Sequence, residues 1–191
     1  MKYGVLILAA GASTRMGTSK QLLKIDNQSL LQKTITTALE IKPTNCTVVL
    51  GSNFDLHKRE IEHLPIDIIL NPGWETGMGS SIKKGIQNLI QYELDAFHIL
   101  VCDQPYLTSA HLGNLVAQFE KSHTNIIASK YQSVHGVPAL FKSAMIATLL
   151  DLADHEGAKK IILNNPHETV EFTRGEVDLD TPEDFEKFIG G

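Results

Sequence analysis

The sequence predicts an α/β fold in which a mainly parallel β-sheet is covered by helices on both faces. Short apolar runs of strand length alternate with segments of helical periodicity along the chain. Turn-forming residues separate the two kinds of segment, and no internal repeat or Pro/Ser-rich linker interrupts the series. Alternation of this kind is typical of strand–helix–strand units, whose strands run parallel.

The first half of the chain supplies the opening strand and the first helix. The apolar run Val5–Ala10 predicts a buried strand, and a loop of small and polar residues follows it. Ser29 and Gln32 have the spacing of a capping box, which places a helix over residues 29–41. The other elements expected here are strands over 46–51 and 66–70 and helices over 54–64 and 80–91, the last capped by Ser80.

The second half continues the alternation. A strand is expected over 96–103, and Thr108 can cap a helix that runs to Lys121. Pro182 suits the first turn of a closing helix, where the missing N–H of proline is not needed. The remaining elements are strands over 125–129, 138–141 and 169–172 and helices over 144–150 and 157–163.

Composition indicates a globular protein with a single domain over residues 1–191. Hydrophobic residues make up 42% of the chain and charged residues 20%, and the net charge of −5 argues against duplex nucleic acid as a partner. No apolar run approaches the roughly 18 residues of a membrane span, and the N-terminal segment does not resemble a signal peptide. Cys46 and Cys102 lie inside apolar runs, as reduced buried thiols do. We therefore expect a cytoplasmic protein without membrane partners.

Ligands of open α/β sheets bind outside the carboxyl ends of the strands. The loops to search are therefore those after Ala10, Leu70, Val101 and Phe172.

The opening loop, LAAGASTRMGTSK, combines glycines with cations. It fits neither the P-loop nor the dinucleotide-binding spacing. Gly11 and Gly17 let the backbone approach a phosphate, and Arg15 and Lys20 can neutralise one. A solvated turn explains a lone glycine loop equally well, but two cations so close behind a buried strand favour anion binding.

Two further loops carry polar groups at strand ends. In NPGWETGMGSSIKKGI, Asn71 breaks the strand, and an exposed helix start at Ser80 suits a base edge or a phosphate. Trp74 can stack on a ligand, although a single tryptophan is more often a packing residue. In VCDQPYL, Asp103 stands at the end of an apolar strand, either as a metal-binding carboxylate or as a cap, and Gln104 helps to fix the exit of the chain.

The last loop, GEVDLDTPEDFEKF, adds Asp178 and Asp180, which share a face of an extended segment. Glu183 and Asp184 have a simpler explanation, because acidic residues in a first helical turn complement the helix dipole. Asp180 has one too, as a helix cap, unless another carboxylate lies near it. Asp103 is the candidate partner, and two such carboxylates would hold Mg²⁺ through oxygen ligands.

At this point the motifs resemble a known family. LAAGASTRMGTSK resembles the L-A-A/G-G-x-S-x-R-M-G-x-x-K signature of MobA-like nucleotidyltransferases. NPGWETGMGSSIKKGI, CDQPYL, GVPALF, GAKKII and VDLDTPEDF follow in the order expected of the molybdenum cofactor cytidylyltransferase branch. The resemblance covers essentially the whole chain. It implies a Rossmann-like three-layer αβα fold with a mainly parallel mixed sheet, similar to the nucleotide-diphospho-sugar transferases.

The resemblance also implies roles for individual residues. Arg15, Lys20 and Asp103 would carry catalysis, and Asp103 with Asp180 would bind Mg²⁺. The nucleotide would contact the first three loops, with the base read by the glycine–serine loop, through Leu8, Ala9, Ala10, Gly11, Arg15, Lys20, Gly77, Gly79, Ser80, Ser81 and Asp103.

Two positions bear on the choice of substrate. The guanylyl-transferring branch usually begins L-A-G-G, so Ala10 favours cytidine over guanosine. Relatives often read G-H-P where this chain has Gly136, Val137 and Pro138, so no pterin contact is assigned to Val137.

The implied reaction is transfer of CMP from CTP to the terminal phosphate of molybdopterin or the molybdenum cofactor. Pyrophosphate would leave, and an apo-molybdenum hydroxylase is a further expected partner. An ionised acceptor phosphate needs no strong base, so His135 and His155 are not assigned that role. Two alternatives stay open, namely transfer to a sugar or polyol phosphate and a non-catalytic accessory protein that carries the cofactor.

Overall fold

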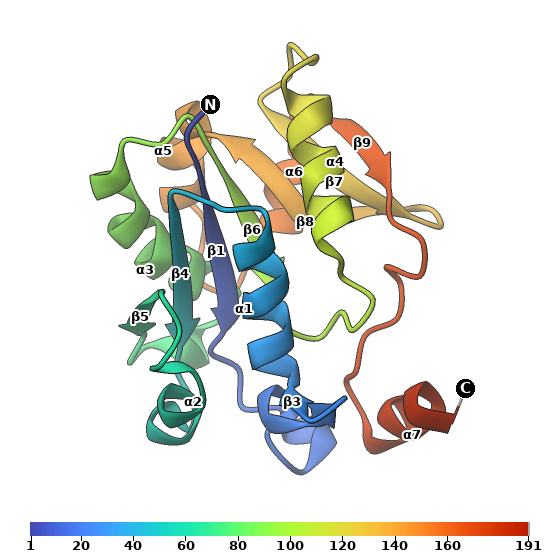
Figure 1. Ribbon diagram of the computed structural model, residues 1–191. Helices are drawn as coiled ribbons and strands as arrows, with labels where there is room; N and C mark the ends of the chain where they lie inside the picture. Colours follow the sequence, from blue (N-terminus) through green and yellow to red (C-terminus); the bar gives the residue numbers. More distant parts are fainter. Residues whose placement is uncertain (191) are drawn as a thin grey trace.

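A seven-stranded β-sheet forms the centre of the protein (Figure 1). The computed structural model describes residues 1–190, and the strands lie in the order β5-β4-β1-β6-β8-β7-β9. β1 (Tyr3–Ala9) pairs in parallel with β4 (Asn45–Leu50) on one side and with β6 (Ala96–Val101) on the other. β5 (Asp67–Leu70) adds a parallel edge strand to β4. The parallel half of the predicted sheet is thereby confirmed.

The second half of the chain makes the sheet mixed. β8 (Val134–Lys142) runs antiparallel to both β6 and β7 (Ile126–Tyr131), and β9 (Glu168–Glu171) is parallel to β7. The predicted strand over 138–141 is therefore shorter than the strand in the structure, β8. It begins at Val134 because a hairpin continues the pairing of β7 and β8 as far as Tyr131 and Val134.

Helices cover both faces of the sheet, as predicted (Figure 1). Val5 and Ile7 of β1 belong to one core cluster, which also contains buried residues of α1 (Leu30–Glu40), α2 (Phe54–Ile61) and α4 (Ser109–Phe119). The neighbouring side chains Leu6 and Leu8 point to the opposite face, because side chains alternate along a strand. There they pack with α3 (Met78–Leu89), α5 (Ile146–Leu150) and α6 (Ala158–Asn164).

Smaller elements lie at the end of the molecule to which β1 and β4 point (Figure 1). β2 (Lys24–Ile25) and β3 (Gln28–Ser29) form a short ladder. α7 (Pro182–Gly190) packs Phe185 and Phe188 against a small cluster that includes Leu179. Short 3-10 turns occur at both ends of the sheet. Thr14–Met16 (η1), Lys20–Leu22 (η2) and Trp74–Thr76 (η3) lie near the carboxyl ends of the parallel strands, and Ile90–Tyr92 (η4) and Ser143–Met145 (η5) lie near their start.

Three helix starts follow the predicted chemistry. The Ser29 hydroxyl accepts a hydrogen bond from the Gln32 N–H, and the Gln32 side chain accepts one from the Ser29 N–H, which completes the capping box. Thr108 accepts from the N–H of the third residue of α4. α7 begins at Pro182, as expected.

The prediction that Ser80 caps α3 is wrong. The helix begins at Met78, and Gly77 precedes it in a backbone conformation with φ 126°. A Cβ atom at Gly77 would lie 2.5 Å from the carbonyl oxygen of Asp154, so only glycine allows this approach. The same oxygen accepts a hydrogen bond of 2.9 Å from the Gly79 N–H. The loop before α6 therefore supplies the cap.

Cys46 and Cys102 are both buried and free, as expected of reduced thiols. Burial raises the pKa of each thiol to about 12. No helix within residues 1–190 has the length and apolar character needed to cross a lipid bilayer.

Two histidines in the core predict a loss of stability in acid. Burial lowers the pKa of His98 on β6 and of His111 on α4 to about 4 each, whereas an unfolded histidine titrates near about 6.5. Between these values the unfolded chain takes up protons that the folded chain does not bind. The free energy of unfolding should therefore decrease as the pH falls from about 6.5 toward about 4.

In the His98→Leu variant this decrease should be shallower by up to about 1.4 kcal/mol per pH unit. Urea unfolding between about pH 7 and about pH 4 measures the difference. The exposed His63→Gln variant is the control and should keep the wild-type pH dependence. An unchanged profile in His98→Leu would contradict the low pKa of the buried ring.

Candidate functional site

A pocket of about 300 Å³ opens at the carboxyl ends of β1 and β6. Residues of the first three predicted loops line it, and most of the residues implied for nucleotide binding are among them. These are Leu8, Ala9, Ala10, Gly11, Lys20, Gly77, Ser81 and Asp103. Arg15, Gly79 and Ser80 do not line the pocket.

The opening loop leaves room for a ligand beside Gly11. A Cβ atom added there would meet no other atom within 4 Å, so crowding within the protein does not require a glycine. Two turns of the same loop use left-handed backbone, at Ser13 with φ 54° and at Gly17 with φ 71°. Between them the η1 turn carries Arg15 outward, and its side chain is 72% exposed.

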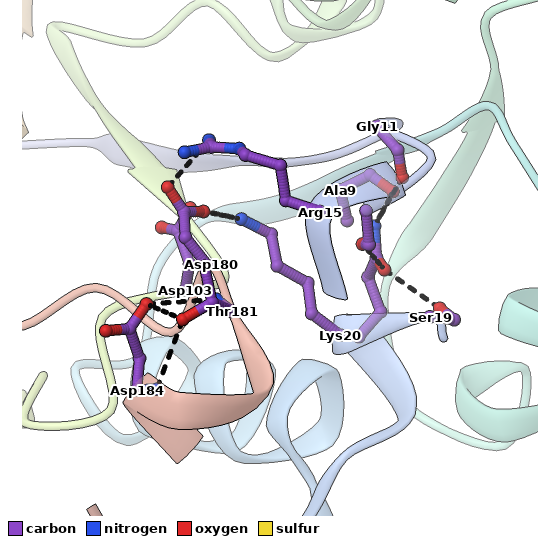
Figure 2. A network of polar contacts seen from close by, with 11 residues as sticks. Ala9, Gly11, Arg15, Ser19, Lys20, Asp103, Asp180, Thr181 and Asp184 are labelled. Carbon is purple, nitrogen blue, oxygen red and sulfur yellow. Dashed lines mark hydrogen bonds and ion pairs between the residues drawn. The ribbon is translucent and has the colours of Figure 1, made fainter. Parts of the chain in front are cut away.

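Lys20 joins two carboxylates from distant parts of the chain (Figure 2). Its Nζ atom donates a hydrogen bond of 2.7 Å to Oδ2 of Asp103 and one of 2.9 Å to Oδ1 of Asp180. Arg15 adds a bond of 2.8 Å to Oδ2 of Asp180. Asp180 is thus an ion-pair residue, and the helix cap that would have explained it is formed by Thr181, whose hydroxyl accepts from the Asp184 N–H.

The charges of this cluster shift one another's titration. Burial by itself would lower the pKa of Lys20, but Asp103 and Asp180 outweigh it and raise that pKa. For Asp180, desolvation acts to raise the pKa, and the contacts with Lys20 and Arg15 reverse this and lower it. Asp178 is exposed, yet partial desolvation of its carboxyl group and repulsion by the neighbouring Asp103 raise its pKa to about 7. Negative charge is therefore in excess at this point.

The glycine–serine loop is built differently from the prediction. Ser80 and Ser81 are buried, and both hydroxyls accept hydrogen bonds of 2.9 and 3.0 Å from the Asn71 side chain. Ser80 donates in turn to the carbonyl oxygen of Gly77. Gly79 packs against the backbone of the loop before α6, where a Cβ atom would lie 2.3 Å from the carbonyl oxygen of Ala153. Of the residues predicted in this loop, Gly77 and Ser81 thus reach the pocket, and Met78 lines it as well.

Trp74 is a packing residue that also reaches the pocket. It is half-buried against the core cluster of α3, and it also lines the pocket. Gly51, which sequence reasoning did not single out, makes this position possible. A Cβ atom at Gly51 would lie 2.6 Å from Trp74 and 2.7 Å from the carbonyl oxygen of Ala10.

Other polar residues near the strand ends have structural roles. The Gln104 side chain is buried and donates to the carbonyl oxygens of Val137 and Gly175, both at 3.2 Å, which ties β6 to β8 and to the last loop. His135 is hydrogen-bonded to His167 at 2.9 Å and does not line the pocket. His155 is exposed beside Gly77 and does not line it either.

The carboxylates fit a hard divalent cation that shares its ligands with a substrate. Oδ1 of Asp103 is buried and has no hydrogen-bond partner among the described residues. Within residues 1–190 no group of three or more His, Cys, Asp or Glu side chains has the arrangement of a metal site. Asp103 and Asp180 offer carboxylate oxygens of the kind that a hard divalent cation takes together with substrate phosphates.

Gln21 also lines the pocket, and sequence reasoning missed it. Its position directly after Lys20 is the only sequence signal, because a polar residue in an irregular loop follows no hydrophobic period.

Comparison with known proteins identifies the family to which this arrangement belongs. The MobA-like NTP transferase domain matches residues 5–170. Molybdenum cofactor cytidylyltransferase of Escherichia coli (strain K12) is 25% identical over 182 residues, which cover 94% of this chain and 92% of that protein. The purine catabolism protein PucB of Bacillus subtilis (strain 168) is 27% identical over an alignment that covers 95% of this chain and 93% of PucB.

Solved structures share the whole fold. Rv0371c from Mycobacterium tuberculosis H37Rv superposes with a TM-score of 0.86 at 21% identity, over 100% of this chain and 99% of that one. A complex of Rv0371c with manganese gives a TM-score of 0.84 at 19% identity, over the full length of both chains. At these identities the likeness establishes the α/β fold and nothing about the ligand.

The charge cluster predicts how Asp180 titrates without its main cation. In Lys20→Met the pKa of Asp180 should rise, because an ammonium group within hydrogen-bonding distance is lost. A pH titration of the side-chain carboxyl signals by ¹³C NMR measures this. Lys24→Met, which removes an exposed lysine from the neighbouring β2 strand, should leave the titration unchanged. An unshifted Asp180 in Lys20→Met would show that Lys20 does not govern its charge.

Proposed function

The chain belongs to the family of MobA-like NTP transferase domains, and we propose that its reaction transfers CMP from CTP to the terminal phosphate of molybdopterin or the molybdenum cofactor. Pyrophosphate is released, and the product is the cytosine dinucleotide cofactor of a molybdenum hydroxylase, to which the protein hands it. The proposal treats residues 1–191 as one domain.

One observation carries the proposal more than any other. Lys20 and Asp103 line a pocket of about 300 Å³ whose wall includes the glycine-containing opening loop, and Lys20 also binds Asp180. A nucleoside triphosphate needs backbone and cations for its phosphates and a space for its base, and this arrangement offers both. The 25% identity with a molybdenum cofactor cytidylyltransferase over 94% of the chain supports the choice of donor and acceptor.

In this reaction the opening loop and the two cations hold the triphosphate. The Lys20 side chain is only 16% exposed, so water screens its charge less than at the surface. Its attraction for the phosphates is correspondingly stronger. Arg15 is exposed and tied to Asp180 alone, so it can turn toward the triphosphate when a ligand arrives. Asp103 and Asp180 would hold Mg²⁺. The bound ion supplies charge neutralisation at the α-phosphate, where the new bond forms.

The acceptor phosphate is the nucleophile. One of its oxygens forms a bond to the α-phosphorus of CTP in line with the pyrophosphate oxygen, whose bond to that phosphorus breaks. A phosphate monoester is largely ionised near neutral pH, so no proton has to be removed by a strong base. His135 is paired with His167 and does not line the pocket, which is compatible with this chemistry. Ala10 lies in the pocket wall and supports cytidine as the base.

A second candidate is an accessory protein that carries the cofactor without transferring a nucleotide. The Bacillus relative is named a purine catabolism protein. This name is compatible with an accessory role, because it specifies no nucleotidyl transfer. The joint presence of Arg15, Lys20, Asp103 and Asp180 in one cluster argues for transfer, because a carrier has no need of all four.

A pyrophosphate-release assay tests the proposed donor and acceptor. With Mg²⁺ and molybdopterin, we expect turnover with CTP and much less with GTP. Sugar and polyol phosphates serve as competing acceptors in the same assay. Turnover confined to those phosphates would replace the pterin acceptor, and tight binding of molybdopterin without pyrophosphate release would support the carrier.

Removing the charge of Asp103 tests the metal assignment. Asp103→Asn keeps the size of the side chain, and we expect kcat/KM to fall about 10³-fold or more, because charge neutralisation at the phosphates is lost. Binding of Mn²⁺, followed by electron paramagnetic resonance, should weaken in parallel, while the melting temperature stays near that of the wild type.

Asp151→Asn is the matched control, since Asp151 is an exposed aspartate outside the pocket. It should retain full turnover and Mn²⁺ affinity. Wild-type turnover in Asp103→Asn would refute the assignment.

A further inference from the structure

Gln21 is the most completely buried polar side chain of the opening loop. It lies in the η2 turn, next to Lys20, and is 1% exposed. Burying an amide is costly unless its hydrogen-bonding groups are paired. Its partners therefore indicate what the residue holds in place.

All four hydrogen-bonding positions of the amide are used. Nε2 donates to the carbonyl oxygen of Gly11 at 2.8 Å and to that of Ala9 at 3.3 Å. Oε1 accepts from the hydroxyls of Ser13 at 3.0 Å and Ser19 at 2.9 Å. Only an asparagine or glutamine side chain offers two donors and two acceptors in this way. Figure 2 shows Ala9, Gly11 and Ser19 gathered around these contacts.

These contacts span the whole opening loop. The two carbonyl oxygens belong to Ala9 at the end of β1 and to Gly11 two residues later, and the two hydroxyls precede the η1 and η2 turns. Ser13 has left-handed backbone, which a non-glycine residue adopts only when its surroundings hold it there. The amide thus fixes the separation between the strand end, the glycine backbone and Lys20.

A further contact anchors this assembly to α2. The Ser19 hydroxyl lies 2.5 Å from Nε2 of His57, which is fully buried. Since the single hydroxyl hydrogen of Ser19 is donated to Gln21, the imidazole N–H must be the donor in this second contact. The loop is therefore braced on a helix that does not touch the pocket.

We propose that Gln21 is a positioning residue for nucleotidyl transfer, which holds the opening loop in the shape that receives the triphosphate before the nucleotide binds. The inference rests on the proposed function, in which the opening loop binds the triphosphate of a nucleotide. Gln21 presents no free hydrogen-bonding group to a ligand, so it acts through the loop backbone and Lys20. Preorganisation of this kind lowers the cost of binding and aligns the reacting groups.

Gln21→Met, which keeps the length of the side chain and removes every hydrogen bond, is the first test. We expect the Kd for CTP to rise about tenfold and kcat/KM to fall about a hundredfold, with both KM and kcat affected. Trp74, the only tryptophan in the chain, lines the pocket and reports binding by fluorescence without an acceptor. A merely structural role would reduce the folded fraction and leave the Kd of the folded molecules unchanged.

Gln21→Glu separates the donors from the acceptors. Its carboxylate can accept from both serines but cannot donate to the carbonyl oxygens of Ala9 and Gly11. Protonation restores one donor. The ratio of the variant's CTP affinity to that of the wild type should therefore recover as the pH is lowered from about 8 to about 6. A constant ratio would overturn the role of the two donated bonds.

Two controls complete the design. Gln87→Met changes an exposed glutamine on α3 outside the pocket and should bind CTP as the wild type does. If Gln21→Met does not fold, the Ser13→Ala variant decides, because it removes one of the two bonds to Oε1 and leaves the contact between Ser19 and His57 in place. A severalfold weaker affinity supports the proposal, and an unchanged affinity overturns it.

The outcomes also separate this inference from the proposed function. Wild-type protein that neither binds a nucleotide nor releases pyrophosphate would remove the proposed function and this inference with it. Wild-type protein that turns over CTP while Gln21→Met has the same Kd, KM and kcat would remove the inference alone.

Discussion

The ammonium group of Lys20 holds together the two carboxylates on which the candidate site depends. Asp103 stands at the exit of β6 and Asp180 just before α7, so without a shared cation two negative charges would face each other beside Asp178. Their repulsion would push the last loop away from the sheet. The contact thus helps to hold that loop, which Gln104 and the hydrogen bond from the Leu179 N–H to the carbonyl oxygen of Asp103 also tie to the sheet. The remaining excess of negative charge suits a divalent cation that enters with a polyphosphate.

The pocket beside this cluster exists because the backbone approaches itself closely in two places. Gly51 lets Trp74 lie against the end of β1, and Gly77 lets the loop before α6 cap α3. In the second contact the N–H group of Gly79, in the first turn of α3, donates to the carbonyl oxygen of Asp154. This N–H group is therefore not available to bind an anion. In the proposed reaction, phosphate recognition is thereby left to the opening loop, where Gly11 faces open space and Gln21 accounts for two hydrogen bonds to the backbone.

In the proposed reaction, charge and shape carry the chemistry of this site, and no protein nucleophile takes part. The buried thiol of Cys102 lies in the pocket wall, but burial raises its pKa to about 12, so it stays protonated. The buried rings of His98 and His111 have a pKa of about 4 and remain neutral at physiological pH. Lys20 and Asp180 are charged under the same conditions, and fixed charges are what binding and polarising a polyphosphate requires.

The sequence by itself determined the alternation of elements, the capping box at Ser29, the cap at Thr108 and the four loops, because periodicity and cap chemistry act over a few residues. Only the tertiary structure decided that Lys20 meets carboxylates 83 and 160 residues away. It also decided that α3 starts at Met78 instead of Ser80 and that β8 is longer than predicted. Gln21 became visible only once its partners converged. These features depend on contacts between segments far apart in the chain, which no local pattern records.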